Sequence, residues 1–133
     1  MEFKKQLIEK LNERFEETLF LNNIFTKLAN KLEIFKNQLD KYTYAGLEIL
    51  YSSDDSNAKL TIEDDFISIE YDFDDMLIYI IADDIIREDY EDYEEARVID
   101  KIGSSDDGES IYWKIGIEKA FDYYLKKAFE NML

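Results

Sequence analysis

Hydrophobic residues in the first 40 positions recur at helical spacing. Those within residues 3–19 return every four positions, which aligns them along one side of a helix. A second set within residues 24–39 alternates between three- and four-residue spacing, as in a helix that packs lengthwise on a partner. Because Asn22 and Asn23 separate the sets, the pattern predicts either a helical hairpin turning near residues 20–23 or one long helix bent there. The sets are Phe3, Leu7, Leu11, Phe15 and Leu19, followed by Ile24, Phe25, Leu28, Leu32, Phe35 and Leu39.

From residue 47 onward the hydrophobic period shortens to two, which is typical of half-buried strands. The clearest alternation covers residues 66–73, and it predicts that Tyr71 is buried. Residues 76–82 are apolar on both phases, as in a central strand. Residues 97–102 form a further strand, and residues 103–108 a hairpin loop leading into a strand over Ser110–Trp113. Short strands joined by acidic turns favour an antiparallel meander.

The chain closes with a regular helical pattern from Ile117 to Phe129. These patterns therefore predict that residues 1–133 form a single acidic domain of the α+β class. Its antiparallel sheet has four or five strands and is packed by the N-terminal helices and the C-terminal helix, because the apolar rows need a common surface. A homodimer seam is the alternative use of the N-terminal row.

Composition narrows the chemistry that the chain can perform. It contains no histidine and no cysteine, which excludes Ser-His-Asp triads, thiolate catalysis and ordinary zinc sites. Hydrophobic residues make up 46% of the chain, enough for a core, but no run approaches the ~18 residues that span a bilayer. We therefore expect a cytoplasmic protein with no membrane contact.

The charge of the chain is negative and concentrated in the middle. Its net charge is −16, and residues 53–109 hold 21 acidic and four basic side chains, whereas residues 1–52 hold eight of each. Such a field repels nucleic acid and steers basic partners toward the protein. Confinement to one segment favours a binding face over charge that only maintains solubility.

The densest acidic stretch runs from Asp83 to Glu95 and contains eight acids, one arginine and two tyrosines. A short acidic helix and an ordered loop are both compatible with it. Tyrosine interleaved with carboxylates suits a groove rich in arginine and lysine, and we expect both rings to be exposed. The predicted binding residues are Asp83, Asp84, Glu88, Asp89, Tyr90, Glu91, Asp92, Tyr93, Glu94 and Glu95.

Catalytic and metal-binding readings find little support in the spacing of the acids. The spacing of a calcium-binding loop is absent, because no glycine follows residues 72–75 and the stretch from Asp106 to Glu109 is too short. Asp100 beside Lys101, with Lys114 nearby, is the one arrangement that suggests a nuclease centre. A strongly acidic surround would repel its phosphate substrate. The sequence predicts no enzyme activity, no metal and no cofactor.

In size and composition the chain resembles small acidic inhibitors of phages and toxin-carrying bacteria, namely DNA-mimic anti-defence proteins and immunity proteins. The resemblance rests on no aligned motif, so no residue role is carried over. It implies an inhibitor that occupies the groove of a basic partner, such as a nuclease, toxin or other nucleic-acid-binding protein, without contacting nucleic acid itself. The alternatives are an acidic chaperone or adaptor for an extended client and a carboxylate-dependent hydrolase.

Overall fold

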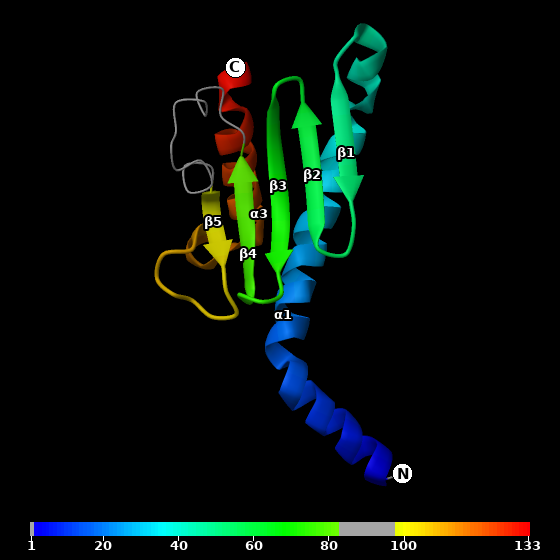
Figure 1. Cartoon of the computed structure of the whole chain (residues 1–133). Coiled ribbons are helices and arrows are strands. Elements are labelled where there is room, and N and C mark those ends of the chain that lie inside the picture. Colours follow the sequence, from blue (N-terminus) through cyan, green and yellow to red (C-terminus); the bar gives the residue numbers. More distant parts are fainter. Residues whose placement is uncertain (1, 83–97) are drawn as a thin grey trace.

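The computed structural model describes residues 2–82 and 98–133, and within them the five strands form one antiparallel sheet in the order β1-β2-β3-β4-β5 (Figure 1). The α+β fold with a five-stranded meander is therefore confirmed. The elements are α1 (Glu2–Leu39), η1 (Asp40–Ala45), β1 (Ile49–Ser53), β2 (Asn57–Ile62), β3 (Asp65–Asp72), β4 (Leu77–Ala82), β5 (Val98–Ile102), α3 (Ile111–Phe129) and η3 (Glu130–Met132).

Both long helices cover the same face of the sheet (Figure 1). On β2 and β4, burial alternates along the strand, so every second side chain points toward α1 and α3. These side chains join one hydrophobic cluster with the buried sides of the two helices. Its fully buried members include Leu21, Leu28, Leu32, Leu60, Ile67, Ile69, Ile78, Ile80, Ile102 and Tyr124. No helix of residues 2–82 and 98–133 covers the other face of the sheet.

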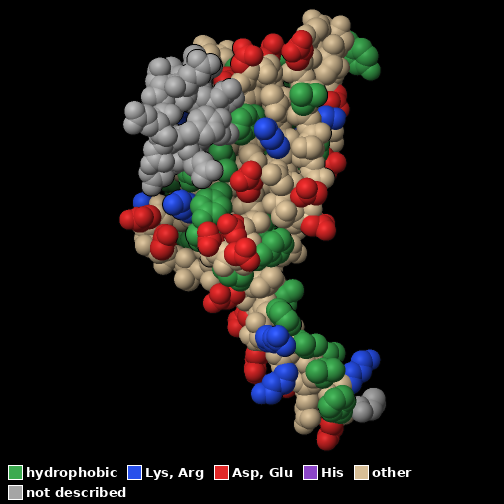
Figure 2. Space-filling view, in the orientation of Figure 1, with side chains coloured by type: hydrophobic (Ala, Val, Ile, Leu, Met, Phe, Trp, Pro, Cys, Tyr) green, Lys and Arg blue, Asp and Glu red, His purple; other side chains and the backbone are tan. Residues whose placement is uncertain are grey.

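The N-terminal region is one continuous helix of 38 residues, not a hairpin. Asn22 and Asn23 are exposed, and the buried residues Leu21 and Ile24 continue the core-facing side past them. The asparagines therefore occupy the solvent side of α1 and do not interrupt it. Its first half extends well beyond the sheet (Figures 1 and 2).

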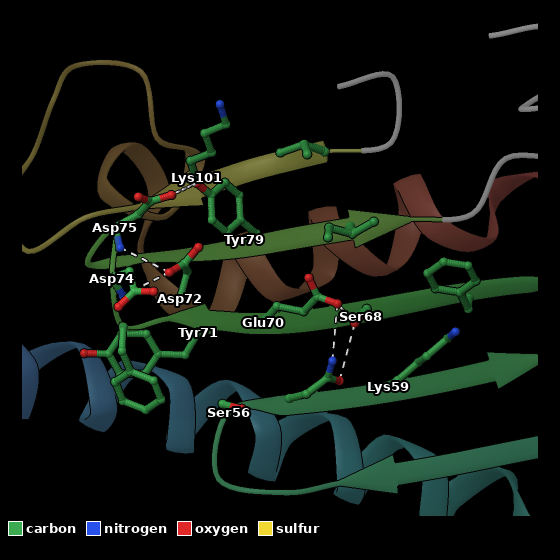
Figure 3. Close-up of a pocket in the computed structure, with 15 residues that line it drawn as sticks. Ser56, Lys59, Ser68, Glu70, Tyr71, Asp72, Asp74, Asp75, Tyr79 and Lys101 are labelled. Carbon is green, nitrogen blue, oxygen red and sulfur yellow. Dashed lines mark hydrogen bonds between the residues drawn. The ribbon is translucent and has the colours of Figure 1, made fainter. Parts of the chain in front are cut away.

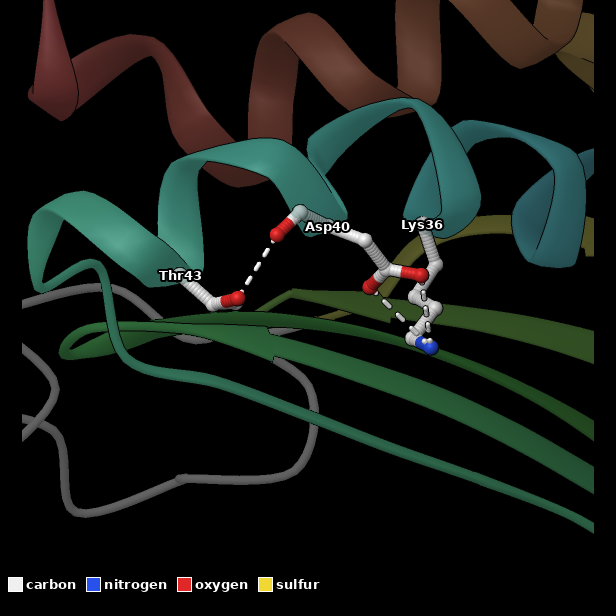
Figure 4. Close-up of polar contacts among 3 residues, drawn as sticks. All are labelled: Lys36, Asp40 and Thr43. Atoms are coloured by element: carbon white, nitrogen blue, oxygen red, sulfur yellow. Dashed lines mark hydrogen bonds and ion pairs between the residues drawn. The ribbon is translucent and has the colours of Figure 1, made fainter.

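Local polar contacts end α1 and turn the chain toward β1 (Figure 4). The Lys36 Nζ lies 3.1 Å from Asp40 Oδ1, one helical turn away, and the Thr43 hydroxyl donates to the Asp40 carbonyl at 2.6 Å. Gly46 follows with φ of 101°, a left-handed conformation that glycine adopts without a steric cost. The backbone then continues into the first strand.

The buried carboxylate of Asp100, on β5, holds the start of α3. It is 6% exposed and accepts the backbone N–H groups of Ile111 and Tyr112, each at 3.1 Å. The hydroxyls of Ser110 and Tyr124 also donate to it, the former at 3.3 Å. An anion at this position satisfies helix N–H groups that have no intrahelical partner and interacts favourably with the helix dipole.

The predicted strand over Ser110–Trp113 is wrong, because Asp100 makes this segment the first turn of a helix. The helix is then interrupted at Gly116, whose φ is 83°. Regular helical geometry therefore resumes near Ile117, where the hydrophobic pattern placed the start of the helix. Phe121, within that pattern, is buried in the core.

In the two described stretches of chain, no helix combines the length and the apolar character needed to cross a membrane.

Replacing Asp100 with Asn should lower the free energy of unfolding by about 2–4 kcal/mol. The asparagine amide has no negative charge to interact with the helix dipole. Its nitrogen cannot accept a hydrogen bond, so it replaces only one of the two carboxylate oxygens as an acceptor. Urea unfolding followed by circular dichroism measures the difference. Asp122→Asn, which removes an exposed acid from the same helix, is the control. A loss below about 1 kcal/mol for Asp100→Asn would contradict the proposed role of this carboxylate.

Stability should also decline in alkali because of Tyr124. Burial, and then the hydrogen bond to Asp100, raise the pKa of this phenol far above its ordinary value. Its folded pKa exceeds its unfolded pKa, so the stabilisation is complete below about pH 10 and is lost as the pH rises further. Urea unfolding between about pH 8 and 11 should show this decline, with a smaller slope in Tyr124→Phe but not in Tyr44→Phe, which removes the hydroxyl of an exposed ring. A free energy of unfolding that stays constant over this range would contradict the argument.

Candidate functional site

The face of the sheet opposite the helices carries a hollow of about 1010 Å³ (Figure 3). Side chains from β2, β3, β4, β5 and the turns before β2 and β4 line it. They alternate along each strand with the core residues, which is why polar groups can occupy this face. The lining includes Asn57, Lys59, Phe66, Ser68, Glu70, Asp72, Phe73, Asp74, Asp75, Tyr79 and Lys101.

Two neutral side chains, Asn57 and Ser68, and one acidic side chain, Glu70, form the polar part of the floor of the hollow. The Asn57 amide donates to Glu70 Oε1 at 3.2 Å, and the Ser68 hydroxyl lies 3.4 Å from the same oxygen. Asn57 stands opposite Glu70 in the β2–β3 register, and Tyr79 stands opposite it in the β3–β4 register. The half-buried Glu70 carboxylate is therefore held by neutral donors.

The acidic end of the hollow is built by the turn between β3 and β4. Asp72 Oδ1 accepts the backbone N–H groups of Asp74 at 3.0 Å and Asp75 at 3.1 Å. This is how aspartate stabilises a tight turn without glycine. The Tyr79 hydroxyl donates to Asp75 Oδ2 at 3.3 Å, so the aromatic ring and the turn support each other.

The two lysines of the hollow lie over aromatic rings. Lys59 Nζ is 4.1 Å from the centre of the Phe66 ring, and Lys101 Nζ is 5.8 Å from that of Tyr79. Such placement gives a cation–π attraction. Across residues 2–82 and 98–133, the ion pairs are found elsewhere, on the helices. The carboxylates of the hollow are therefore not neutralised by a neighbouring cation in that part of the chain.

An aromatic pair borders the hollow beside the acidic turn. The rings of Tyr71 and Phe73 lie 4.2 Å apart, and Phe73 is half exposed. Tyr71 is buried, as predicted, and its hydroxyl donates to the carbonyl of Thr18 in α1 at 3.3 Å. The exposed ring thus rests on a side chain that is fixed to the helix layer.

The meander gathers three acidic turns at one end of the sheet, which we call the acidic edge. In an antiparallel meander, alternate connections fall at the same end, so the turns after β1, β3 and β5 lie together (Figure 1). Figure 2 shows acidic side chains at this end and others at the opposite end. The acidic edge consists of Asp54, Asp55, Asp72, Asp74, Asp75, Asp106, Asp107 and Glu109.

Aspartates of the acidic edge have local structural roles as well as charge. Asp54 Oδ1 accepts the N–H groups of Ser56 and Asn57, at 2.9 and 2.8 Å. Asp107 accepts those of Glu109 and Ser110, and these backbone hydrogen bonds lower the pKa of the Asp107 carboxyl. Because these side chains accept the backbone N–H groups of the turns, aspartate stabilises turns at positions where glycine could not.

The structure separates the groups suggested as a nuclease centre. Asp100 points toward the helices, where five donors surround its carboxylate. Lys101, the next residue along β5, lines the opposite face. Asp100 thus holds a helix in place and does not share a site with Lys101. No group of three potential ligands able to hold a metal ion occurs among the described residues.

The acidic segment from Asp83 to Glu95 lies outside the described residues, so its role and the exposure of Tyr90 and Tyr93 remain predictions. Sequence reasoning did not assemble Glu70, Asp72 and Tyr79 into one site. The signal was the polar phase of the alternation over residues 66–73. Only the β3–β4 register shows that Glu70 lies opposite the ring of Tyr79.

Comparisons with protein-family models, curated proteins and solved structures give no match for this chain. The chemistry of the hollow is therefore inferred from its own residues. Carboxylates that have no ion pair within residues 2–82 and 98–133, next to the exposed ring of Phe73 and the partly exposed ring of Tyr79, suit the binding of a cationic side chain from a partner. The polar floor offers further acceptors, chiefly Glu70.

The electrostatic character of the hollow can be measured on Tyr79. Burial, and then Asp75 and Asp72, raise the pKa of this phenol above its ordinary value. Asp75→Asn should bring the pKa of Tyr79 down toward about 10, because it removes the carboxylate that accepts the hydrogen bond. NMR titration of protein carrying ¹³C-labelled tyrosine reports this value, with Asp122→Asn as the control for one lost charge. An unchanged Tyr79 titration in Asp75→Asn would contradict the electrostatic coupling.

Proposed function

We propose that the protein binds a basic protein in the cytoplasm and inhibits it by occupying its nucleic-acid-binding or catalytic groove. The observation that carries the proposal is the hollow, where Glu70, Asp72, Asp74 and Asp75 lie together without an ion-pair partner in the described chain. A cationic side chain of a partner would supply the missing charge. The protein acts by binding and performs no reaction.

Geometry supports recognition of arginine or lysine in this hollow. A cation that enters from solvent meets the carboxylates of the β3–β4 turn and the ring of Tyr79. Charge-assisted hydrogen bonds to a carboxylate are roughly twice as strong as neutral ones. Phe73 offers an exposed apolar surface for the stem of a long basic side chain.

The acidic edge extends this surface beyond one pocket. It carries charge from three turns, and such a field raises the rate at which a basic partner arrives. The segment from Asp83 to Glu95 adds eight acids to the chain between Ile81 and Val98, two residues that line the hollow. The partner would therefore meet a broad acidic surface that imitates the phosphates of a nucleic acid.

Two triple variants separate a local site from the overall field. Glu70→Gln, Asp74→Asn and Asp75→Asn together remove three charges from the hollow. Glu33→Gln, Asp122→Asn and Glu130→Gln remove three from exposed positions on the helices. We expect about 10- to 100-fold weaker binding for the first and less than about threefold for the second. Calorimetric titration against the basic product of a neighbouring gene measures both, and inhibition of that product's nucleic-acid binding should follow affinity.

Replacing Glu88, Asp89, Glu91 and Asp92 with Ser should weaken binding by on the order of 100-fold, with a further loss for Tyr90→Ala. The affinity of the wild-type protein should fall steeply from low to moderate salt. Equal affinities for all of these variants, insensitive to salt, would contradict the proposal. Salt-insensitive binding of an extended, unfolded client would favour the chaperone alternative.

A further inference from the structure

The N-terminal half of α1 carries an apolar row that is exposed on the described part of the chain. Residues 2–19, which we call the arm, are about 27 Å long at 1.5 Å per residue and lie beyond the sheet for most of that length, up to Thr18 at its base (Figures 1 and 2). The row consists of Phe3, Leu7, Leu11, Phe15 and Leu19, and these side chains are between 42% and 74% exposed. At the base of the arm, the ring of Phe20 stacks on that of Trp113, with 6.0 Å between their centres. The arm therefore starts from a fixed point on the body of the protein.

We propose that the arm pairs with the arm of a second copy of this chain, in an antiparallel arrangement centred on Leu11. The even spacing of the row makes it symmetric about that residue. A twofold axis near Leu11 brings Leu7 of one copy onto Phe15 of the other, and Phe3 toward Leu19. Each copy thus supplies the surface that the other needs, as a twofold interface requires.

The four-residue spacing also sets the crossing of the two arms. Such a row forms one ridge on the helix surface, and two such ridges interlock when the helices cross at about −50°. Contact is therefore closest around Leu11 and decreases toward Phe3 and Leu19. Leu11 meets its own copy, so it is the position where a substitution acts twice.

Charge on the arm favours the antiparallel direction. Lys4 and Lys5 lie near its free end, and Glu16 and Glu17 lie near the body. Antiparallel pairing places the lysines of one arm beside the glutamates of the other. Parallel pairing would bring like charges together, which is destabilising on neighbouring helices.

The charge of the whole chain acts in the same sense. Each copy has a net charge of −16, and two such bodies repel each other at close range. The antiparallel pair places the bodies at opposite ends of the crossed arms. Their separation is then several times the screening length of about 8 Å at physiological ionic strength. A parallel pair would hold them side by side.

The polar side of the arm suits a protein surface better than a membrane. It carries five acidic and four basic residues, mixed along its length. Helices that bind anionic membranes concentrate lysine and arginine on this side. Interspersed charges of both signs are typical of paired helices.

Light scattering across a dilution series tests the pairing with two matched variants. Leu11→Glu places two carboxylates opposite each other, and we expect the dissociation constant of the dimer to rise at least about 100-fold. Ile34→Glu changes an exposed apolar residue on the same helix outside the arm and should leave the dimer unchanged. Circular dichroism checks that both variants fold. The proposal would be overturned if the wild-type protein were monomeric, and binding of that monomer to anionic vesicles would indicate a membrane-binding arm instead. It would also be overturned if the dimer tolerated Leu11→Glu.

Disulfide trapping tests the direction, because the chain contains no cysteine of its own. Leu7→Cys and Phe15→Cys proteins should cross-link rapidly when mixed and slowly when oxidised separately, whereas Leu11→Cys alone should cross-link to itself. Rapid self-linking of Leu7→Cys without reaction with Phe15→Cys would indicate parallel arms and overturn the arrangement. These measurements use no basic partner, so their outcome is independent of the proposed inhibitory function.

Discussion

The buried carboxylate of Asp100 links the two layers on which the rest of the structure depends. It belongs to β5, yet nearly all of its hydrogen bonds go to α3, from the first helical N–H groups to the hydroxyl of Tyr124. A charge at this depth is costly unless it is surrounded by donors, and here the helix terminus provides them. The carboxylate thereby sets the position at which the helix begins. Once α3 is fixed there, its apolar side meets the sheet beside α1 and closes the core on one face only.

The one-sided covering explains why the chain has a candidate binding surface at all. A sheet with helices on both faces would bury both alternating sets of side chains on each strand. Here the described helices cover one set only, and the other set is in part exposed to solvent. Glu70 and Asp72 are partly exposed there, while Ile69 and Tyr71, their neighbours in sequence, are buried. The lysines of this face lie over aromatic rings, so among the described residues they leave the carboxylates of the hollow without an ion pair. Binding capacity therefore follows from the same alternation that builds the core.

Sequence patterns were sufficient for the layers of this fold and insufficient for its details. The alternation over residues 66–73 and the short connections predicted the meander, because both depend on local geometry. The first turn of α3 was missed, since the signal for it is Asp100, more than ten residues upstream of Tyr112 and close to it only after folding. The hollow was missed for a related reason. Its acids and Tyr79 lie on different strands, and only their register shows that they share a surface.

The order of the strands also bears on how quickly the protein reaches its native state. Every strand pairs with its neighbour in sequence, and all but the last pair are joined by connections of a few residues. The contacts of such a sheet have low sequence separation, so little loop entropy is lost before the first hairpins are stabilised. The exception is the docking of α3 beside α1, where the two ends of the chain must meet. Because contacts of high sequence separation form slowly, we expect this docking to limit the folding rate, and a sheet formed early from hairpins to shorten the search.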